Sequence, residues 1–228
     1  IWLTSRFVLY AFLAAGLPQA QLRVVPHPVQ VPAEPETRFD RGRVRVLTMY
    51  DPKSGLERKN PAGAIAAWRH AFPDASENAE LIVKSLLPNA GLESLAAGRR
   101  DIVFLNATLS DEEQQTLVGS CDILLSLHRA EGFGLPLAEA MAAGLAVVAT
   151  EGTGNADFMS VDNSILIPAH PVPASTLYNG PRAKWLEPDL NLAAHHLRVL
   201  VHDARLRHAL GDRAHSDMKM HHKGWTTG

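Results

Sequence analysis

Six short apolar runs alternate with stretches of helical pattern, and this alternation constrains the fold of the chain more than any other feature. The runs start roughly 20 to 35 residues apart and are rich in Val, Ile and Leu. Such spacing is typical of βαβ units, in which helices cover both faces of a parallel sheet. We therefore predict an α/β fold with a Rossmann-like, doubly wound parallel sheet of about six strands, and ligands at the carboxyl ends of those strands. The runs are 44–49, 80–85, 101–106, 122–127, 145–150 and 164–169.

Helix boundaries between these runs carry their own signals. Asn60 precedes Pro61, which predicts an N-cap followed by proline at the first helical position. Residues 110–113 read SDEE, a capping box. Pro136 is expected to open a helix that Gly144 ends, because glycine adopts the backbone conformation that terminates helices. A tail from about residue 185 also shows helical spacing and predicts helices that pack on the sheet, at Leu192, Leu197, Leu200 and Leu206.

The first 35 residues differ in character from the rest. Residues 5–15 predict a helix with Gly16 at its C-terminal cap, and residues 22–28 a short β-like piece. Four prolines follow in ten residues over 26–35, so this stretch should run extended over a surface and connect two units. We place a domain boundary there.

Composition excludes several classes of function. A formal net charge of -2 over 228 residues gives no reason to expect nucleic acid as a partner. Cys121 is the single cysteine, which excludes an intrachain disulfide framework, suits a reducing, cytoplasmic compartment and is expected to be buried. The apolar start, interrupted by Arg6, Gly16 and Pro18, resembles neither a membrane span nor a signal peptide. Histidine and cysteine spacings predict no metal site, and the missing initial Met suggests a fragment.

The stretch from Ser126 to Gly144 holds the most chemistry. Glu131 directly follows the fourth predicted strand, and Glu139 falls in the first turns of the next helix, so we expect both carboxylates to face the strand-end crevice. Backbone N–H groups of residues 133–135 lie at a helix N-terminus, which favours a phosphate. Two carboxylates that flank a phosphate cradle fit a nucleotide sugar. Two glutamates eight apart also occur by chance in many helices, so the strand, the glycines and the proline around them carry the argument.

The segment EGFGLPLAEAMAAGLAVVAT resembles the Glu-x7-Glu signature of retaining glycosyltransferases with the two-domain GT-B fold. IWLTSRF is similar to the last part of that family's acceptor domain, and RVVPHPV to its interdomain linker. The resemblance implies that the chain is the C-terminal, donor-binding half of a GT-B fold. It divides the chain into the end of an acceptor domain, a linker, a nucleotide-sugar-binding domain and a tail, at 1–25, 26–42, 43–214 and 215–228.

The resemblance also implies roles for the residues of the signature. Glu139 would bind the ribose hydroxyls and Glu131 the hydroxyls of the donor sugar. The backbone around Gly132, Phe133, Gly134 and Leu135 would hold the diphosphate. We expect Glu131 to position the sugar rather than to attack it.

A second cluster, YDPKSGLERKNP, follows the first strand of the predicted sheet. There the family has an arginine and, five residues later, a lysine that neutralise the diphosphate. Lys59 matches the lysine, and with Glu131 it is our candidate catalytic residue. Ser54 stands in place of the arginine, and the adjacent Arg58 is expected to supply the missing cation. Two neighbouring basic residues in a loop are also commonly just solvated.

Four further positions leave alternatives open. Lys84 ends the second strand on the ligand side, where it either binds the donor or is an ordinary surface lysine. Asn106 resembles the loop that meets the nucleobase, although its side chain can be incidental. Residues 155–157 stand where the family often has a glutamate. His128 is more often a packing or hydrogen-bonding residue than a catalyst at such a place.

Together these features predict half of a hexosyl-transferring, retaining enzyme that moves sugar from a nucleotide-diphosphate donor to an acceptor hydroxyl. No cofactor and no metal are expected. The acceptor, a glycan, lipid or other hydroxyl compound, would bind through a missing N-terminal domain. This chain alone should therefore be inactive. Peripheral association of the full enzyme with a membrane stays open. The alternatives are a non-catalytic nucleotide-sugar-binding or structural module, and an NAD enzyme, which would need a G-x-G-x-x-G absent after the first strand.

Overall fold

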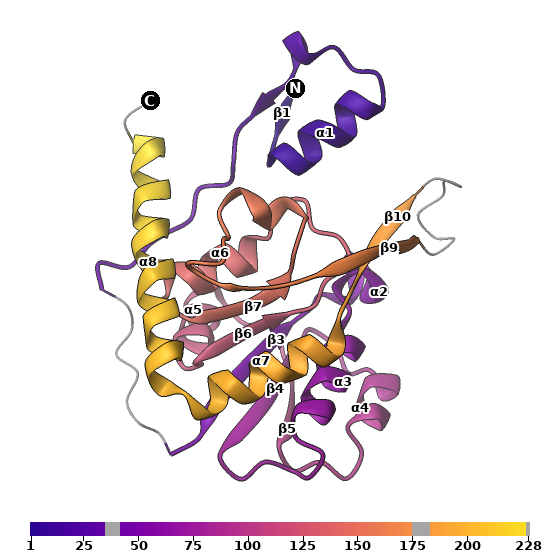
Figure 1. Cartoon of the computed structure of the whole chain (residues 1–228), viewed down its shortest axis with the longest axis vertical. Coiled ribbons are helices and arrows are strands. Elements are labelled where there is room, and N and C mark those ends of the chain that lie inside the picture. The colour runs from indigo at the N-terminus through magenta and orange to yellow at the C-terminus, as the bar shows by residue number, and fades with distance from the viewer. Residues whose placement is uncertain (35–41, 175–182, 227–228) are drawn as a thin grey trace.

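The computed structural model describes residues 1–34, 42–174 and 183–226, and its centre is a six-stranded sheet (Figure 1). All neighbouring strands in this sheet are parallel, in the order β5-β4-β3-β6-β7-β8. Each predicted run overlaps one strand of this sheet, so the prediction of a doubly wound parallel sheet is confirmed. The strands are β3 (Val44–Met49), β4 (Ala79–Ser85), β5 (Ile102–Asn106), β6 (Ile123–Ser126), β7 (Ala146–Thr150) and β8 (Ile165–Ile167).

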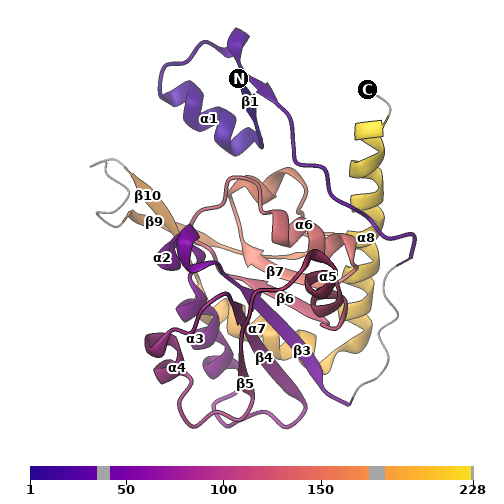
Figure 2. The same ribbon diagram turned by 180° about the vertical axis from the view of Figure 1, so that it is seen from behind.

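Two hydrophobic cores lie on opposite faces of the sheet, because successive side chains of a strand point to opposite sides. Val46 and Leu125 belong to one core, and their neighbours Leu47 and Leu124 belong to the other. Helices α3 (Pro61–Ala71), α4 (Ala90–Leu95) and α7 (Leu190–His202) cover the first face. Helices α5 (Asp111–Gly119), α6 (Leu135–Ala142) and α8 (Ala204–Thr226) cover the second (Figures 1 and 2).

The strand order reverses between β3 and β6. From β3 the chain builds outward through β4 and β5, and from β6 it builds the other way through β7 and β8. Connections after β3 and β6 therefore diverge to opposite faces and leave a crevice at the carboxyl ends of these two strands, where doubly wound proteins bind their ligands. After β3 the chain forms the 3-10 turn η2 (Pro52–Ser54) and the one-turn helix α2 (Leu56–Lys59), and after β6 it forms the loop 127–134.

The predicted helix boundaries are confirmed. Asn60 caps α3 by accepting the Gly63 N–H at 3.0 Å, and it adopts the left-handed conformation with φ of 53°. Ser110 and Glu113 form the predicted capping box at the start of α5. Helix α6 begins one residue before Pro136, and Gly144 follows its end with φ of 81°.

A β-hairpin was not predicted. Strands β9 (Ala169–Pro173) and β10 (Lys184–Pro188) pair antiparallel and project beside α2 (Figure 1). The helical tail predicted from about residue 185 therefore starts only at Leu190, which corrects that boundary. A local sequence pattern does not reveal β10, because its partner β9 precedes it by the stretch 175–182. That stretch lies outside the described residues. Trp185, 7% exposed, is buried and pairs with Val172 of β9.

The first 24 residues form a small unit next to the crevice. Strands β1 (Trp2–Leu3) and β2 (Arg23–Val24) pair in parallel around α1 (Arg6–Ala14) and the short turn η1 (Gln19–Gln21). The predicted helix and its terminating Gly16, with φ of 89°, are confirmed. Residues 26–34 of the predicted linker lead from this unit toward α8 (Figure 2), and residues 35–41 lie outside the described ones.

The C-terminal helix is continuous. Helix α8 passes residue 214 without a break, and Ala214, His215 and Met218 are buried. Of the predicted tail 215–228, residues 227–228 lie outside the described part. No helix among the described residues is both long and apolar enough to cross a membrane.

Candidate functional site

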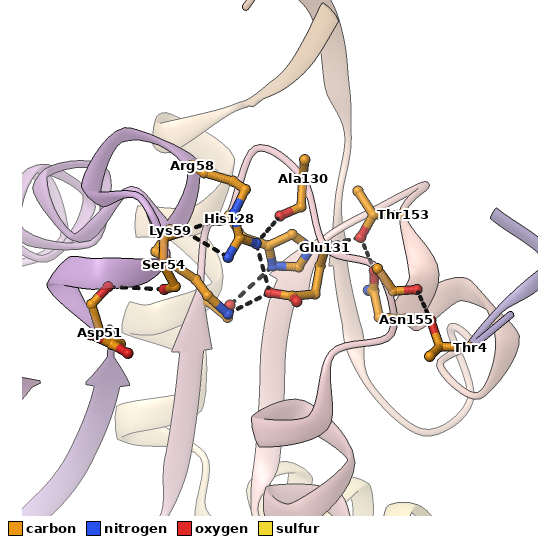
Figure 3. A network of polar contacts seen from close by, with 12 residues as sticks. Thr4, Asp51, Ser54, Arg58, Lys59, His128, Ala130, Glu131, Thr153 and Asn155 are labelled. Atoms are coloured by element: carbon orange, nitrogen blue, oxygen red, sulfur yellow. Dashed lines mark hydrogen bonds and ion pairs between the residues drawn. The ribbon is translucent and has the colours of Figure 1, made fainter. Parts of the chain in front are cut away.

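The crevice between β3 and β6 brings together three of the predicted charged residues. Lys59 Nζ donates to Glu131 Oε2 at 2.5 Å, and Arg58 Nη1 lies 3.4 Å from the same oxygen (Figure 3). The cations come from α2 and the carboxylate from the loop after β6, so residues 72 positions apart in sequence meet because their strands are neighbours. All three side chains are largely buried, with exposed fractions of 13 to 20%.

The environment of Glu131 keeps its carboxylate ionised. Burial alone would raise the pKa of Glu131, but the charge and hydrogen bond of Lys59, followed by the charge of Arg58, lower it below its ordinary value. A buried carboxylate with a depressed pKa is an acceptor for hydrogen bonds at neutral pH. Lys59 and Arg58 in turn form a local positive site in a chain with no overall positive charge.

The guanidinium of Arg58 folds back onto Ser54. Its Nε and Nη2 donate to the Ser54 carbonyl at 3.0 and 2.9 Å, and Nη1 donates to the Ala130 carbonyl at 2.8 Å. The Ser54 hydroxyl itself donates to the Asp51 carbonyl at 2.9 Å. The guanidinium of Arg58 thus lies beside Ser54, four residues earlier in the chain.

The loop that carries Glu131 is clamped by a glycine. The Gly154 N–H donates to the Glu131 carbonyl at 2.9 Å, and a Cβ at Gly154 would lie 2.2 Å from the Gly132 carbonyl oxygen. Ser5 and Thr4 donate to that same oxygen at 2.6 and 3.3 Å. Two separate segments, residues 4–5 and the loop with Gly154, therefore hold the backbone next to the carboxylate.

His128 is fully buried and ties two strand-end loops together. Its Nδ1 lies 3.0 Å from Ser126 Oγ, and its Nε2 lies 2.8 Å from Thr153 Oγ1. Because the Thr153 hydroxyl donates its one hydrogen to Asn155 Oδ1, it accepts from His128, which places the imidazole proton on Nε2. Burial lowers the pKa of His128 to about 4, so the ring is neutral at physiological pH. The structure gives this histidine a hydrogen-bonding role.

Glu139 lies in a separate groove. Helices α5 and α6 and residues 28–32 enclose a volume of about 540 Å³ that both Glu139 and Asp111 line. Burial, and then the charge of Asp111, raise the pKa of Glu139. Its carboxylate forms no hydrogen bond or ion pair with any described residue. The two glutamates thus occupy different surroundings, one paired with cations and one unpaired in the groove.

The backbone between the glutamates offers free donors. The N–H groups of Phe133, Gly134 and Leu135 find no acceptor among the described residues. Gly134, with φ of 97°, occupies the N-cap of α6 without a capping side chain. Such groups at a helix N-terminus attract anions.

The two remaining predicted residues serve the neighbouring strands. Lys84 is buried and donates to the carbonyls of Ser85 and Ala107 at 3.2 and 2.8 Å. Burial lowers the pKa of Lys84, and Asp51 partly opposes that effect. Asn106 makes a long, 3.5 Å hydrogen bond to Glu93. Within the described part of the chain, no three His, Cys, Asp or Glu side chains are placed to hold a metal ion.

Sequence reasoning missed Thr153 and Arg129 at this site. Thr153 lies within the glycine-rich loop after β7, and its contact with His128 depends on how that loop folds. Arg129 adjoins His128 in sequence, but its partners lie on two distant segments.

Comparison with known sequences identifies the family. A sequence model described as "Glycosyl transferases group 1" matches residues 55–176, which is 122 of the 228 residues. The match includes α2, the loop with Glu131 and helix α6. This chain belongs to the glycosyl transferases group 1 family. The six-stranded sheet is the Rossmann-like fold of the C-terminal domain of GT-B glycosyltransferases.

Several similar proteins are longer than this chain. MMP alpha-(1->4)-mannosyltransferase from Mycolicibacterium hassiacum is 35% identical over 111 residues, which are 48% of this chain and 27% of that protein. The crystal structure of WaaG, a glycosyltransferase involved in lipopolysaccharide biosynthesis, superposes with a TM-score of 0.70 at 18% identity, over 100% of this chain and 62% of WaaG. A mutant of TarM from S. aureus, crystallised with fondaparinux, alpha-GlcNAc-glycerol and UDP, gives a TM-score of 0.74 at 13% identity, over 99% of this chain and 42% of TarM. The chain therefore spans about a quarter of the curated relative.

Proposed function

We propose that this chain is the donor-binding half of a retaining glycosyltransferase that transfers a hexose from a nucleotide-diphosphate sugar to an acceptor hydroxyl. The observation that carries the proposal is the meeting of Arg58 and Lys59 with Glu131 at the point where the strand order reverses. Cations for a diphosphate and a carboxylate for sugar hydroxyls adjoin there, in a chain of this family.

The diphosphate would bind to Lys59 and Arg58. Both cations pair with the same oxygen of Glu131. A bound diphosphate would take over the lysine and free the carboxylate to accept hydrogen bonds from the sugar. The unpaired N–H groups of residues 133–135 supply further donors to the phosphates.

The nucleoside would occupy the groove lined by Glu139. A carboxylate accepts two hydrogen bonds side by side, which matches the adjacent hydroxyls of a ribose. Its lack of any partner among the described residues leaves it available for this contact. Asn106 and Lys84 would act from the adjoining strands, Lys84 by holding the backbone at Ala107 in place.

Catalysis would depend on charge that develops on the leaving diphosphate. Lys59 and Arg58 are preorganised for that charge, and such electrostatic stabilisation requires neither a metal nor a cofactor. We propose that Glu131 orients the sugar while the acceptor attacks from the same face as the leaving group. We propose that the acceptor binds to a domain outside this chain, so that the isolated chain would bind donor without turnover. We also propose a cytoplasmic location for this half.

The direct test is calorimetric titration of the chain with UDP, GDP and ADP and with their hexose derivatives. UDP is the first probe because TarM was crystallised with it. We expect at least one nucleoside diphosphate to bind. Lys59→Ala should weaken that binding about 10- to 100-fold, because a charge-assisted hydrogen bond contributes about 1.5–3 kcal/mol.

Glu139→Ala provides the second arm of the same titration. It should weaken binding of the diphosphate and of the free nucleoside by similar factors. Lys59→Ala, in contrast, should leave the affinity for the free nucleoside unchanged. Arg100→Ala, far from the crevice on an exposed surface ion pair, serves as the control. Absence of binding to all three nucleotides, or equal affinities in Lys59→Ala and the parent, would contradict the proposal.

A further inference from the structure

Arg129 contacts helix α2, which carries Arg58 and Lys59, but forms no hydrogen bond with the Glu131 carboxylate. Its Nη1 donates to the Glu57 carbonyl at 2.8 Å, and its backbone N–H donates to the Arg58 carbonyl at 2.8 Å. Both acceptors belong to α2, whose last two residues are Arg58 and Lys59. Arg129 itself sits in the loop after β6, two residues before Glu131.

These two carbonyls need donors from outside α2. In a continuing helix, the Glu57 carbonyl would accept from the N–H of residue 61, but that residue is Pro61 and has no N–H. The chain also turns at Asn60, in the left-handed conformation, so the Arg58 carbonyl loses its helical donor as well. A four-residue helix is too short to be stable by itself. Arg129 supplies both missing hydrogen bonds.

The hairpin β9–β10 holds Arg129 in turn. Its guanidinium pairs with the Glu187 carboxylate through two hydrogen bonds, Nε to Oε2 at 2.5 Å and Nη2 to Oε1 at 3.0 Å. The Leu186 N–H donates to the Arg129 carbonyl at 2.9 Å, and the guanidinium carbon lies 5.9 Å from the ring centre of Trp185. The hairpin lies beside α2 in both views of the molecule (Figures 1 and 2).

We propose that Arg129, anchored by Glu187 on the hairpin β9–β10, is the positioning residue that holds α2 so that Arg58 and Lys59 face Glu131. This inference rests on the proposed function in one respect: it makes the hairpin a support for diphosphate binding. Its structural content, the placement of the two cations against the carboxylate, is independent of any ligand.

The first test measures the pKa of Glu131 from the carbon-13 NMR shift of its carboxylate during a pH titration. The variant Glu131→Gln assigns the resonance. Arg129→Lys keeps the charge but loses the fork that reaches both Glu57 and Glu187. We expect it to raise the pKa of Glu131 by roughly 1, a tenfold change in its acid dissociation constant, because the lysine and arginine that depress it move away.

Glu187→Gln is the second variant, and it discriminates sharply. Removing this negative charge by itself favours a lower pKa for Glu131, so a rise in that variant can come only from displacement of α2. Glu77→Gln, on the exposed ion pair with Arg100, is the matched control and should leave the titration unchanged. Thermal unfolding of each variant shows that it is folded before it is titrated.

The second test compares binding of UDP with binding of uridine, or of whichever nucleoside diphosphate the chain accepts. Arg129→Lys and Glu187→Gln should weaken binding of the diphosphate about tenfold and leave the affinity for the nucleoside unchanged. A general loss of structure would weaken binding of both ligands. If the parent chain binds no nucleotide, the proposed function fails and the titration still decides the role of Arg129. A titration of Glu131 that matches the parent in both variants overturns the proposal.

Discussion

The ion pair between Lys59 and Glu131 shows how single residues prepare this site. Each would be costly to bury alone, and each lowers the cost for the other. Glu139 is the opposite case, a half-buried carboxylate whose surroundings disfavour its charge. Glu131 and Glu139 therefore act on stability with opposite sign.

The first residue-scale prediction concerns Glu131. Its pKa is lower in the folded chain than in the unfolded chain, so its stabilising effect is complete above the unfolded value and is lost as the pH falls through the folded value. Glu131→Gln should lower the free energy of unfolding by about 1.5–3 kcal/mol at pH 7. Urea unfolding between pH 3 and 7 should show this difference shrink below about pH 4. A constant difference over that range would contradict the ion pair.

The second concerns Glu139. Its pKa is higher in the folded chain, so the ionised carboxylate destabilises the fold above the unfolded value, and this penalty is absent when both states are protonated. Glu139→Gln should therefore raise the free energy of unfolding at pH 7 by up to about 0.5 kcal/mol. The gain should vanish near pH 3, and nucleotide affinity should fall in the same variant. A loss of stability at pH 7 would show that the carboxylate has a partner that stabilises it.

Short elements position these residues at the next scale. Helix α2 is one turn long, and its direction is set by Asn60, which turns the chain, caps α3 and donates through its side chain to the Leu127 carbonyl at 2.8 Å. That last bond joins the end of α2 to the end of β6. The cations and the carboxylate thus share a junction between two strand-end elements.

The close approach of two loops gives an element-scale prediction with a built-in control. A Cβ at Gly154 would meet the Gly132 backbone at 2.2 Å, whereas a Cβ at Gly132 meets nothing nearer than 3.7 Å. Gly154→Ala should cost about 1–3 kcal/mol in unfolding free energy, because the backbone beside Glu131 must shift. Gly132→Ala should change stability by less than about 0.5 kcal/mol. Equal effects in thermal unfolding would show that the loops have room to separate.

The molecule consists of the domain built on the six-stranded sheet and a small unit formed by its first 24 residues. All nine residues of α1 are at least partly exposed. The unit meets the loop after β6 through Ser5, which donates to the Gly132 carbonyl, and the segment after β7 through Arg6, whose N–H and Nε donate to Asp157 at 2.8 and 3.0 Å. Few apolar contacts attach it, so it should open without the rest of the chain.

Hydrogen exchange tests this at the scale of the molecule. Amides of α1 should exchange far faster than those of β3, β6 and β7, which open only on global unfolding. Asp157→Ala should speed exchange in α1 further and leave these strands unchanged, since it removes contacts at the helix start alone. Equal protection of α1 and the central strands would mean that the unit unfolds together with the sheet.

Much of this organisation was predictable from local signals. Strand periodicity, the Asn60 cap, the capping box at Ser110 and the glycine after α6 each lie within a few residues, and all appear as predicted. The hairpin was missed because its strands are separated by residues 175–182. We expected Glu131 and Glu139 to face one crevice, but Glu139 lines a groove beside α5, because its position on α6 directs the carboxylate toward that helix.

The sequence by itself determined the parallel sheet, its helix boundaries and the family, since these depend on patterns that neighbouring residues impose on one another. The tertiary structure decided which charges meet. Lys59 and Glu131 are 72 residues apart, and Arg129 and Glu187 are 58 apart. Such pairs form only after the strand order is set and the hairpin is docked, because side-chain contacts across a fold depend on where whole elements lie and not on the residues beside them.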